Sequence, residues 1–188
     1  ELDHGRGDVE HGETDDRLDA LGIHHRTVDH APIFTVEEGE AFKRTLPGGH
    51  SKNLFLKDKK GTLVLVVALG ETRVDLVGLG RALGVKGRLS FGRSELMEEV
   101  IGVTPGSVTP FALINDAAGR IDRVVLDAAL FAHDPVWFHP LRNDASTAVT
   151  PGDLVRFIRE CGHQPIIADP SAPPAIAGAL LSPGGEAM

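Results

Sequence analysis

A lysine placed directly after a glycine-rich turn is the first residue of this sequence with an evident chemical use. Lys52 follows the run Gly48-Gly49-His50-Ser51, and glycines let backbone amides approach a ligand closely. The lysine ammonium can then hold a phosphate or polarise a carbonyl group. The spacing of a phosphate-binding P-loop, GxxxxGK followed by Ser or Thr, is absent. A solvated lysine at the start of a strand is the competing interpretation.

His139 is the second candidate, because it lies in a Trp-Phe-His-Pro run just before a turn rich in short polar side chains. These are Asn143, Asp144, Ser146 and Thr147. A histidine beside such groups can act as a general base or donate a hydrogen bond to a substrate. The alternative is a strand histidine whose ring bonds to the backbone.

Other reactive residue types carry weaker signals. His24, His25 and His30 suggest a metal site, but adjacent strand residues point to opposite faces and cannot easily share an ion. Cys161 has no evident partner in the sequence and fits a buried structural thiol better than a nucleophile. Ser107 lacks the G-x-S-x-G pattern of a serine hydrolase. We therefore expect no metal site and no cofactor.

The signals of helices and strands are interleaved along the chain. Thr35 followed by Glu38 is a capping box that opens a helix reaching about Leu46. Thr150-Pro151 is typical of a helix N-terminus and precedes the last helix, Gly152–Cys161. We further expect a short helix after Thr14, helices at Leu76–Leu83 and Glu95–Ile101, and strands at His24–His30, Asn53–Lys57, Thr62–Leu69, Leu89–Phe91 and Gln164–Ala168.

Three hairpins are expected. The strands Asn53–Lys57 and Thr62–Leu69 form the first, and the second and third are Phe111–Asn115 with Arg123–Asp127 and Trp137–Leu141 with Ala145–Val149. Between them, residues 102–110 (GVTPGSVTP) contain two prolines and two glycines, which fix a turn with free amides and carbonyls. Because these elements do not alternate as βαβ units, we predict an α+β fold, a single domain with a mixed, largely antiparallel sheet and surrounding helices.

Length and composition indicate one folded domain. The 188 residues fit a single domain, which we place at residues 14–170. Residues 1–13 are acidic and aperiodic and are predicted to be disordered, and residues 171–188 are predicted to be a flexible tail rich in Pro, Ala and Gly. One cysteine fits a reducing cytosol, and no run reaches the roughly 18 apolar residues of a membrane span. We expect a cytoplasmic monomer without membrane contact.

The charge is divided unevenly along the chain. The net charge is −8, but residues 1–22 hold eight acidic residues against two arginines, whereas residues 43–60 hold six basic residues against one acidic one. Local patches, more than total charge, meet phosphates. A candidate nucleic-acid surface therefore comprises Lys57, Lys59, Lys60, Arg81, Lys86 and Arg88. A solvated charged face is the more common alternative.

Four segments together resemble one known family. They are Pro32–Glu38, Lys52–Phe55, GVTPGSVTP at 102–110 and FHPLRNDAST at 138–147. In this order they resemble the YbaK-like superfamily of aminoacyl-tRNA editing domains, over about Asp16 to Pro170. Within it, the chain is most similar to the free-standing deacylases related to the editing insertion of bacterial prolyl-tRNA synthetase, which clear alanine from tRNA(Pro). The resemblance implies a YbaK-like fold and hydrolysis of the ester that joins a wrong amino acid to the terminal adenosine.

The resemblance also implies roles for particular residues. Lys52 matches the family's essential lysine and would orient the terminal nucleotide through its phosphate or the ester itself, and His139 is the second catalytic candidate. No residue is an obvious strong base, which agrees with the family's proposed mechanism, in which a ribose hydroxyl of the tRNA helps to activate the water. Catalysis would then be largely positioning and electrostatic stabilisation. The implied substrate-binding residues are Ile33, Phe34, Asn53, Gly102, Val103, Thr104, Pro105, Gly106, Ser107, Asn143, Ser146 and Thr147.

The expected partner is the acceptor end of an aminoacylated tRNA, with prolyl-tRNA synthetase or an elongation factor as transient partners. The segment Arg142–Thr147 stands where cysteine-specific relatives carry Gly-Gly-x-Ser-Pro, which favours the alanine-editing branch. A deacylase for another small amino acid, Cys or Ser, is one alternative. A catalytically silent tRNA- or nucleic-acid-binding module of the same fold is another, and an unrelated metal- or phosphate-binding α+β protein is the third.

Overall fold

A computed structural model describes residues 12–172 of the chain. Of the residues expected to be disordered (1–13) and of the expected tail (171–188), residues 1–11 and 173–188 lie outside this part. Gly12 and Glu13 were expected to be disordered, but they begin the first helix, which therefore starts before Thr14. No described helix is long and apolar enough to cross a membrane. The elements in chain order are α1 (Gly12–Ala20), β1 (Arg26–Asp29), α2 (Val36–Lys43), β2 (Gly49–Lys57), β3 (Leu63–Leu69), α3 (Leu76–Ala82), β4 (Ser90–Phe91), α4 (Ser94–Ile101), the 3-10 helix η1 (Pro110–Asn115), β5 (Ile121–Asp127), the 3-10 helix η2 (Ala128–Ala132), β6 (Val136–Phe138), β7 (Ala145–Val149), α5 (Pro151–Glu160) and β8 (Ile166–Ala168).

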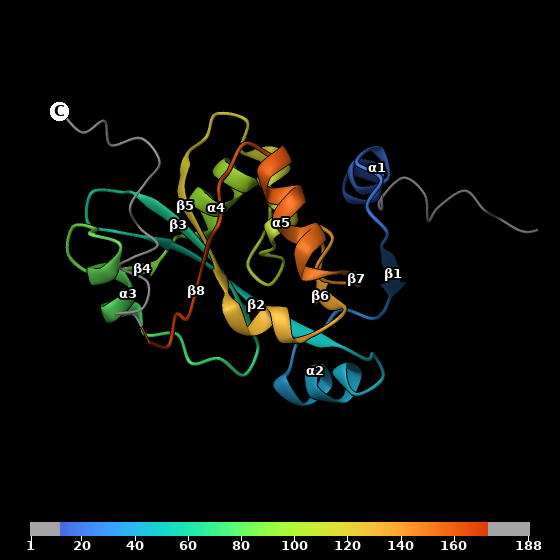
Figure 1. The fold of residues 1–188 in the computed structure, drawn as a ribbon. Coiled ribbons are helices and arrows are strands. Elements are labelled where there is room, and N and C mark those ends of the chain that lie inside the picture. The colour runs from blue at the N-terminus through green and yellow to red at the C-terminus, as the bar shows by residue number, and fades with distance from the viewer. Residues whose placement is uncertain (1–11, 173–188) are drawn as a thin grey trace, which may run out of the picture.

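The described strands form one mixed sheet in the order β1-β7-β6-β2-β3-β5-β8, with β4 paired to β2. Four strand pairings are antiparallel (β1–β7, β6–β7, β2–β3 and β2–β4) and three are parallel (β2–β6, β3–β5 and β5–β8). The predicted α+β domain with a mixed, mainly antiparallel sheet is therefore confirmed. The sheet and its helices are shown in Figure 1.

The second predicted hairpin is wrong. Residues Pro110–Asn115 form the 3-10 helix η1, and β5 pairs in parallel with β3 and β8. Proline has no N–H for a strand ladder, and the Thr109 hydroxyl accepts the N–H of Phe111 and starts the helical turn. The apolar run after Pro110 fills the core from this turn. The other two hairpins form as predicted, β2 with β3 and β6 with β7.

Successive side chains of β2 and β3 point to opposite faces of the sheet and pack into two different hydrophobic core layers. Phe55, Leu65 and Val67 pack with α4 and α5 in the main cluster, whereas Leu56 and Val66 pack with α3 in a second cluster on the opposite face. This alternation is the period of two expected for a strand. It places α3 on the opposite side of the sheet from α4 and α5 (Figure 1).

The glycine pair before Lys52 lies against β6. The strand predicted from Asn53 begins four residues earlier, at Gly49, whose N–H donates to the carbonyl of Pro135. Gly48 has a φ of 116°, and a Cβ atom there would stand 2.3 Å from the same carbonyl oxygen. Only glycine allows this close approach at this backbone conformation. The contact fixes where β2 joins β6.

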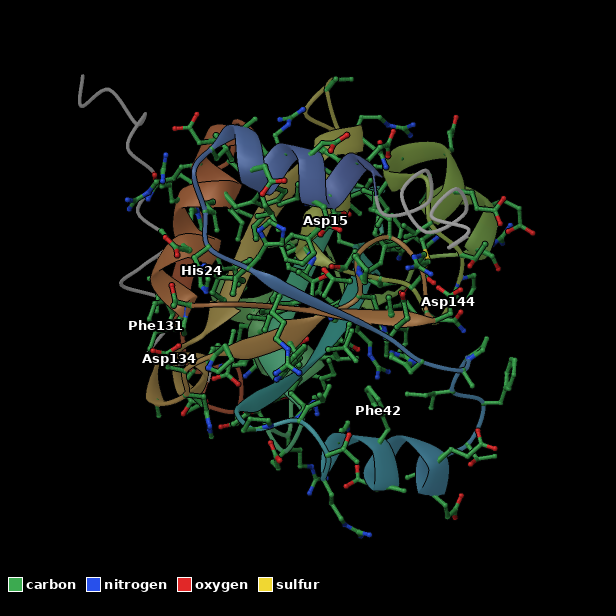
Figure 2. The ribbon with its side chains drawn as sticks, turned by 90° about the vertical axis from the view of Figure 1, so that its right-hand side faces the viewer. Asp15, His24, Phe42, Phe131, Asp134 and Asp144 are labelled. Carbon is green, nitrogen blue, oxygen red and sulfur yellow. The ribbon has the colours of Figure 1, made fainter. Side chains whose placement is uncertain are left out.

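Helix α2 covers the first part of the sheet. Its N-cap Thr35 accepts the N–H of Glu38, as the capping box predicts. Leu46 packs with Trp137 and Ala148 in a third small cluster, and Phe42 contacts it. Phe42 points from α2 towards the sheet in Figure 2. One helix thus forms a wall over β6 and β7.

Candidate active site

A cavity of about 390 Å³ lies between α2 and the strands β2 and β6. It is open on one side to solvent, and its walls come from segments that are distant in the sequence. The segment before α2 and the helix itself supply one wall, and the turn after β6 supplies the other. The lining residues are Ile33, Phe34, Thr35, Val36, Gly39, Glu40, Phe42, Lys43, His50, Ser51, Gly106, Trp137, Phe138, His139, Asn143 and Ser146.

The cavity exists because β2 and β6 separate after a short contact. They pair in parallel only at Gly49 and His50, and Ser51 then donates from its hydroxyl to the carbonyl of Trp137 at 2.8 Å. Asn53 donates from Nδ2 to Ser51 Oγ at 3.3 Å, while its Oδ1 is buried without a hydrogen-bond partner among the described residues. Asn53 does not line the cavity and shares its face of β2 with Ser51.

Lys52 is not among the residues that line the cavity, but it directly follows His50 and Ser51, which are. Because alternate strand residues share a face, Lys52 is on the same side of β2 as His50, which does line the cavity. The side chain is half-buried, and Lys52 Nζ has no hydrogen-bond or ion-pair partner in the described part of the chain. A phosphate or carbonyl oxygen beside this strand could therefore bind the ammonium.

His139 forms part of the opposite wall. Its Nδ1 lies 3.3 Å from the carbonyl oxygen of Ala145, and a carbonyl only accepts, so this bond places the proton on Nδ1 and the lone pair on Nε2. Burial lowers the pKa of His139, the Ala145 hydrogen bond opposes this, and His30 adds to the lowering when its ring is protonated. The ring is consequently a neutral hydrogen-bond acceptor at neutral pH.

His30 is a site residue that sequence reasoning missed. Its Nε2 lies 3.1 Å from Ser146 Oγ and its Nδ1 lies 2.8 Å from the carbonyl oxygen of Ala31. Its ring centroid is 4.2 Å from that of Phe42, so two of its partners line the cavity. From the sequence alone, His30 was a candidate only for a metal site. Its position just before the Ala31-Pro32 break was the one local feature that marked it. Its hydrogen-bond partner Ser146 is 116 residues away in the chain, so the contact could not be foreseen.

The other two histidines of the suspected metal site point elsewhere. His24 is exposed, and His25 Nε2 lies 3.4 Å from Asp15 Oδ1. Helix α1, which carries Asp15, lies across the sheet from α2 in Figure 2. Within residues 12–172, no group of three or more His, Cys, Asp or Glu side chains could hold a metal ion.

The structure brings only part of the GVTPGSVTP segment to the cavity. Gly106 lines it, whereas Gly102 ends α4 with a φ of 65° and Val103 is buried in the main core. Ser107 donates its N–H to the carbonyl of Thr104 and closes a turn with Pro105 at its exposed side. The turn therefore presents Gly106 to the cavity.

The remaining predicted residues are divided between the rim, the wall and the opposite face of the sheet. Phe34 lies at the rim with 81% of its surface exposed. Ile33, Asn143 and Ser146 line the walls. Thr147 is fully buried on the other face of β7, where its hydroxyl lies 2.7 Å from that of Thr27.

Comparison with known proteins shows the family to which this chain belongs. The sequence profile of the family described as "Aminoacyl-tRNA editing domain" matches residues 30–157, which include both walls of the cavity. The chain belongs to this family of aminoacyl-tRNA editing domains. The resemblance stated from the four sequence segments is thereby confirmed.

Several relatives of this editing domain are named after prolyl-tRNA synthetase or prolyl-tRNA. Prolyl-tRNA synthetase associated domain-containing protein 1 of Mus musculus is 41% identical over 159 residues, which cover 82% of this chain and 93% of the relative. The prolyl-tRNA editing protein ProX of Acetoanaerobium sticklandii is 32% identical over 148 residues, covering 78% of this chain and 89% of the relative.

Solved structures show the same fold. The hypothetical protein APE2540 superposes with a TM-score of 0.67 at 24% identity, covering 84% of this chain and 97% of the other. A protein described as a candidate trans-editing enzyme for prolyl tRNA synthetase superposes with a TM-score of 0.65 at 23% identity, covering 86% and 96%. The described fold is thus that of an editing domain.

The candidate nucleic-acid residues of the editing domain gather at the other end of β2. The carboxylate of Asp58 accepts the N–H groups of Lys60, Thr62 and Lys86, and Lys59 donates its N–H to the carbonyl of Lys86. Burial acts to raise the pKa of Asp58, but these backbone hydrogen bonds outweigh it and hold the pKa below its usual value. The Asp58 carboxylate thus ties the β2–β3 turn to the loop after α3.

These hydrogen bonds hold the backbones of Lys59, Lys60 and Lys86 close together. We call them, with Lys57 and the exposed Arg81 and Arg88, the cationic surface. Lys59 lies over Gly87, where a Cβ atom would meet its side chain at 3.4 Å. At about 3.3 Å per strand residue, Lys57 is roughly 23 Å along β2 from His50. The cationic surface is therefore separate from the cavity but on the same strand.

Proposed function

We propose that this editing domain is a trans-acting aminoacyl-tRNA deacylase that hydrolyses mischarged Ala-tRNA(Pro). The observation that carries the proposal is the cavity itself, where segments from α2, β2, the 102–110 turn and the 138–147 turn converge. The names of the relatives, which refer to prolyl-tRNA synthetase and to prolyl-tRNA editing, support the choice of tRNA. An enzyme of this kind would act in the cytoplasm, where tRNA is charged and used.

In this proposal the ester of the terminal ribose lies between Lys52 and His139. The Lys52 ammonium holds the terminal phosphate or the ester carbonyl oxygen, and the free backbone groups at Gly106 orient the ester and the water. His139 Nε2 accepts a hydrogen bond from the bound substrate. A ribose hydroxyl of the tRNA helps to activate the water, because the lining residues include no strongly basic group other than Lys43, which lies 3.3 Å from Glu40. Catalysis is then mainly positioning.

Specificity for a small amino acid follows in this proposal from the walls of the cavity. Ile33 and Phe42 on one side and Trp137 on the other enclose it with apolar surface. A proline ring that clashes with a wall is rejected more sharply than a merely missing methylene, which is worth about 1–3 kcal/mol. Serine and cysteine are close to alanine in size, so both belong in the test.

The test is deacylation of alanyl-, prolyl-, cysteinyl- and seryl-tRNA(Pro) by the wild type and by Lys52→Ala. We expect rapid loss of alanine and a strong loss of activity in the variant. Arg156→Ala, which removes an exposed cation from α5, is the matched control and should behave as the wild type. Preferred hydrolysis of cysteine or serine would overturn the alanine assignment. Tight tRNA binding with no hydrolysis of any ester would leave a catalytically silent binding module.

A further inference from the structure

Ser146 is held in one hydrogen-bonding role by His30. His30 Nδ1 must donate to the carbonyl of Ala31, since a carbonyl can only accept. In the neutral ring Nε2 then has no proton, so the Ser146 hydroxyl donates to it across 3.1 Å. The backbone N–H of His30 also bonds to the carbonyl of Asp144, and Phe42 packs against the ring. The orientation of the imidazole is therefore fixed.

A serine hydroxyl has one proton and two lone pairs. Because Ser146 directs its proton to His30, its oxygen can act towards a ligand only as an acceptor. Ser146 lines the cavity although it is only 8% exposed. Its oxygen is thus a buried acceptor at the cavity wall.

His139 offers a second acceptor on the same wall. Its proton lies on Nδ1, directed to the Ala145 carbonyl, and its Nε2 carries a lone pair. Both residues line the cavity and come from the β6–β7 segment. Asn143 lines the same wall and can donate from its amide, but His139 Nε2 and Ser146 Oγ can only accept. Two such acceptors fit a ligand group that has several N–H bonds and a positive charge.

We propose that His139 Nε2 and Ser146 Oγ bind the α-ammonium group of the aminoacyl ester, and that His30 is the positioning residue that keeps Ser146 an acceptor. The inference rests on the proposed function. The α-ammonium is the part of an aminoacyl ester that supplies several N–H donors, whereas the ester and the phosphates only accept. The site therefore distinguishes an aminoacyl ester from an N-blocked one.

Glu40 is the competing anchor for an ammonium, because it also lines the cavity. Its carboxylate lies 3.3 Å from Lys43 Nζ, and 55% of its side chain is exposed. An exposed carboxylate that is already paired gains little from a second cation. The wall formed by Ser146 and His139 is more buried, and hydrogen bonds there discriminate more strongly.

The experiment compares alanyl-tRNA(Pro) with N-acetyl-alanyl-tRNA(Pro) at pH 8, as a ratio of kcat/KM. The wild type should prefer the free amino group roughly 10- to 100-fold, which corresponds to the loss of one or two hydrogen bonds. Ser146→Ala and His30→Phe should each reduce this ratio to a few-fold. His30→Gln should preserve most of it, because its amide oxygen can accept the Ser146 proton. A fold defect would lower both rates together and leave the ratio unchanged.

If no ester is hydrolysed, binding of substrate analogues that cannot be hydrolysed tests the inference instead. The probes are 3′-alanylamino-3′-deoxyadenosine, whose amide link resists an esterase, and its N-acetyl derivative. The same variants should shift the ratio of their dissociation constants in the same order. An unchanged ratio in Ser146→Ala and His30→Phe, or a ratio lost only in Glu40→Gln, would overturn the inference. Loss of hydrolysis with the binding ratio intact would instead contradict the proposed function alone.

Discussion

The two ends of β2 meet their surroundings in different ways. At the start, Gly49 and His50 pair with β6, and the following residues are half-buried and polar beside a cavity. At the end, Leu56 and Phe55 are buried in the two core layers, and the Asp58 carboxylate ties the exposed lysines into one surface. One end adjoins a cavity, and the other carries closely spaced positive charges.

This difference shows why the net charge of −8 is a poor guide to the partner. The cationic surface concentrates charge that the total conceals, and phosphates respond to the local field. The cavity lies directly before Lys52 on β2, and its lining is mainly apolar and uncharged polar side chains with the paired Lys43 and Glu40. We expect substitutions at the two ends to separate chemistry from tRNA binding.

The largest expected effect is at Lys52. Lys52→Ala should lower kcat/KM for alanyl-tRNA(Pro) by about 10²- to 10³-fold, because the variant lacks a charge that stabilises the transition state in a partly dry site. Lys59→Ala removes the same charge from the other end of β2 and should change kcat little. Single-turnover kinetics with saturating enzyme separate these effects. Equal losses of kcat in the two variants would contradict a separate role for the two ends of β2.

Gly48→Ala should destabilise the cavity end strongly. The added Cβ would stand 2.3 Å from the Pro135 carbonyl oxygen, at a φ of 116° that disfavours alanine. We expect a loss of about 2–4 kcal/mol in the free energy of unfolding, measured by urea denaturation. Gly61→Ala, in the turn at the cationic end, has a φ of 86° but no atom within 4 Å of the new Cβ. It should cost less, and an equal cost would show that steric contact with Pro135 is unimportant.

Reversing the charges of Lys57, Lys59 and Lys60 to Glu should weaken tRNA binding by about tenfold or more at low salt, because the surface then repels phosphates. It should also flatten the salt dependence of binding, by about 0.7–0.9 in the log–log slope for each phosphate that the variant no longer neutralises. Binding isotherms at low and at near-physiological salt measure both quantities. The rate constant of ester hydrolysis in the bound complex should stay unchanged. An unaltered salt slope would show that the cationic surface is only solvated.

The smallest effect is expected at Asp58. Asp58→Asn should lower the free energy of unfolding by about 1–2 kcal/mol at neutral pH, because three backbone amides would no longer have a charged acceptor. The folded-state pKa of Asp58 is depressed, so its contribution is present above the unfolded pKa and is lost as the pH falls through the folded one. The wild type and the variant should therefore converge in stability below about pH 4. A constant difference far into the acid range would contradict this.

Local signals in the sequence predicted the five described α-helices and two of the hairpins, but neither 3-10 helix. Thr35 and Thr150 cap their helices through side-chain oxygens, as the patterns indicate, and the seven apolar residues of β3 pack against both core layers. The η1 segment was mistaken for a strand because a short apolar run has no period that separates the two structures. The parallel pairing of β5 with β3 could not be predicted from local signals, because α3, β4, α4 and η1 lie between the two strands in the chain.

The residues of the candidate site likewise fall into those that the sequence marks locally and those that it does not. Lys52, His139 and Gly106 could be singled out because turn chemistry and polar neighbours mark them locally. His30 could not, since its contact with Ser146 depends on the pairing of β1 with β7, which aligns Asp29 with Ala145. Trp137 was noted only as part of its run, and its role as a wall depends on the packing of α2.

The short contact between β2 and β6 has a consequence for how the site can change over time. No described strand pairs with that edge of β2 between His50 and Leu56, where β4 begins to pair. Main-chain groups along such an edge offer the same hydrogen bonds whatever side chains the strand carries. In the proposed function, the phosphate and ribose that every tRNA end shares can be held there, while the wall on α2 varies. In that proposal, new amino-acid preferences can evolve on the α2 wall without rebuilding the strand edge that would hold the nucleotide.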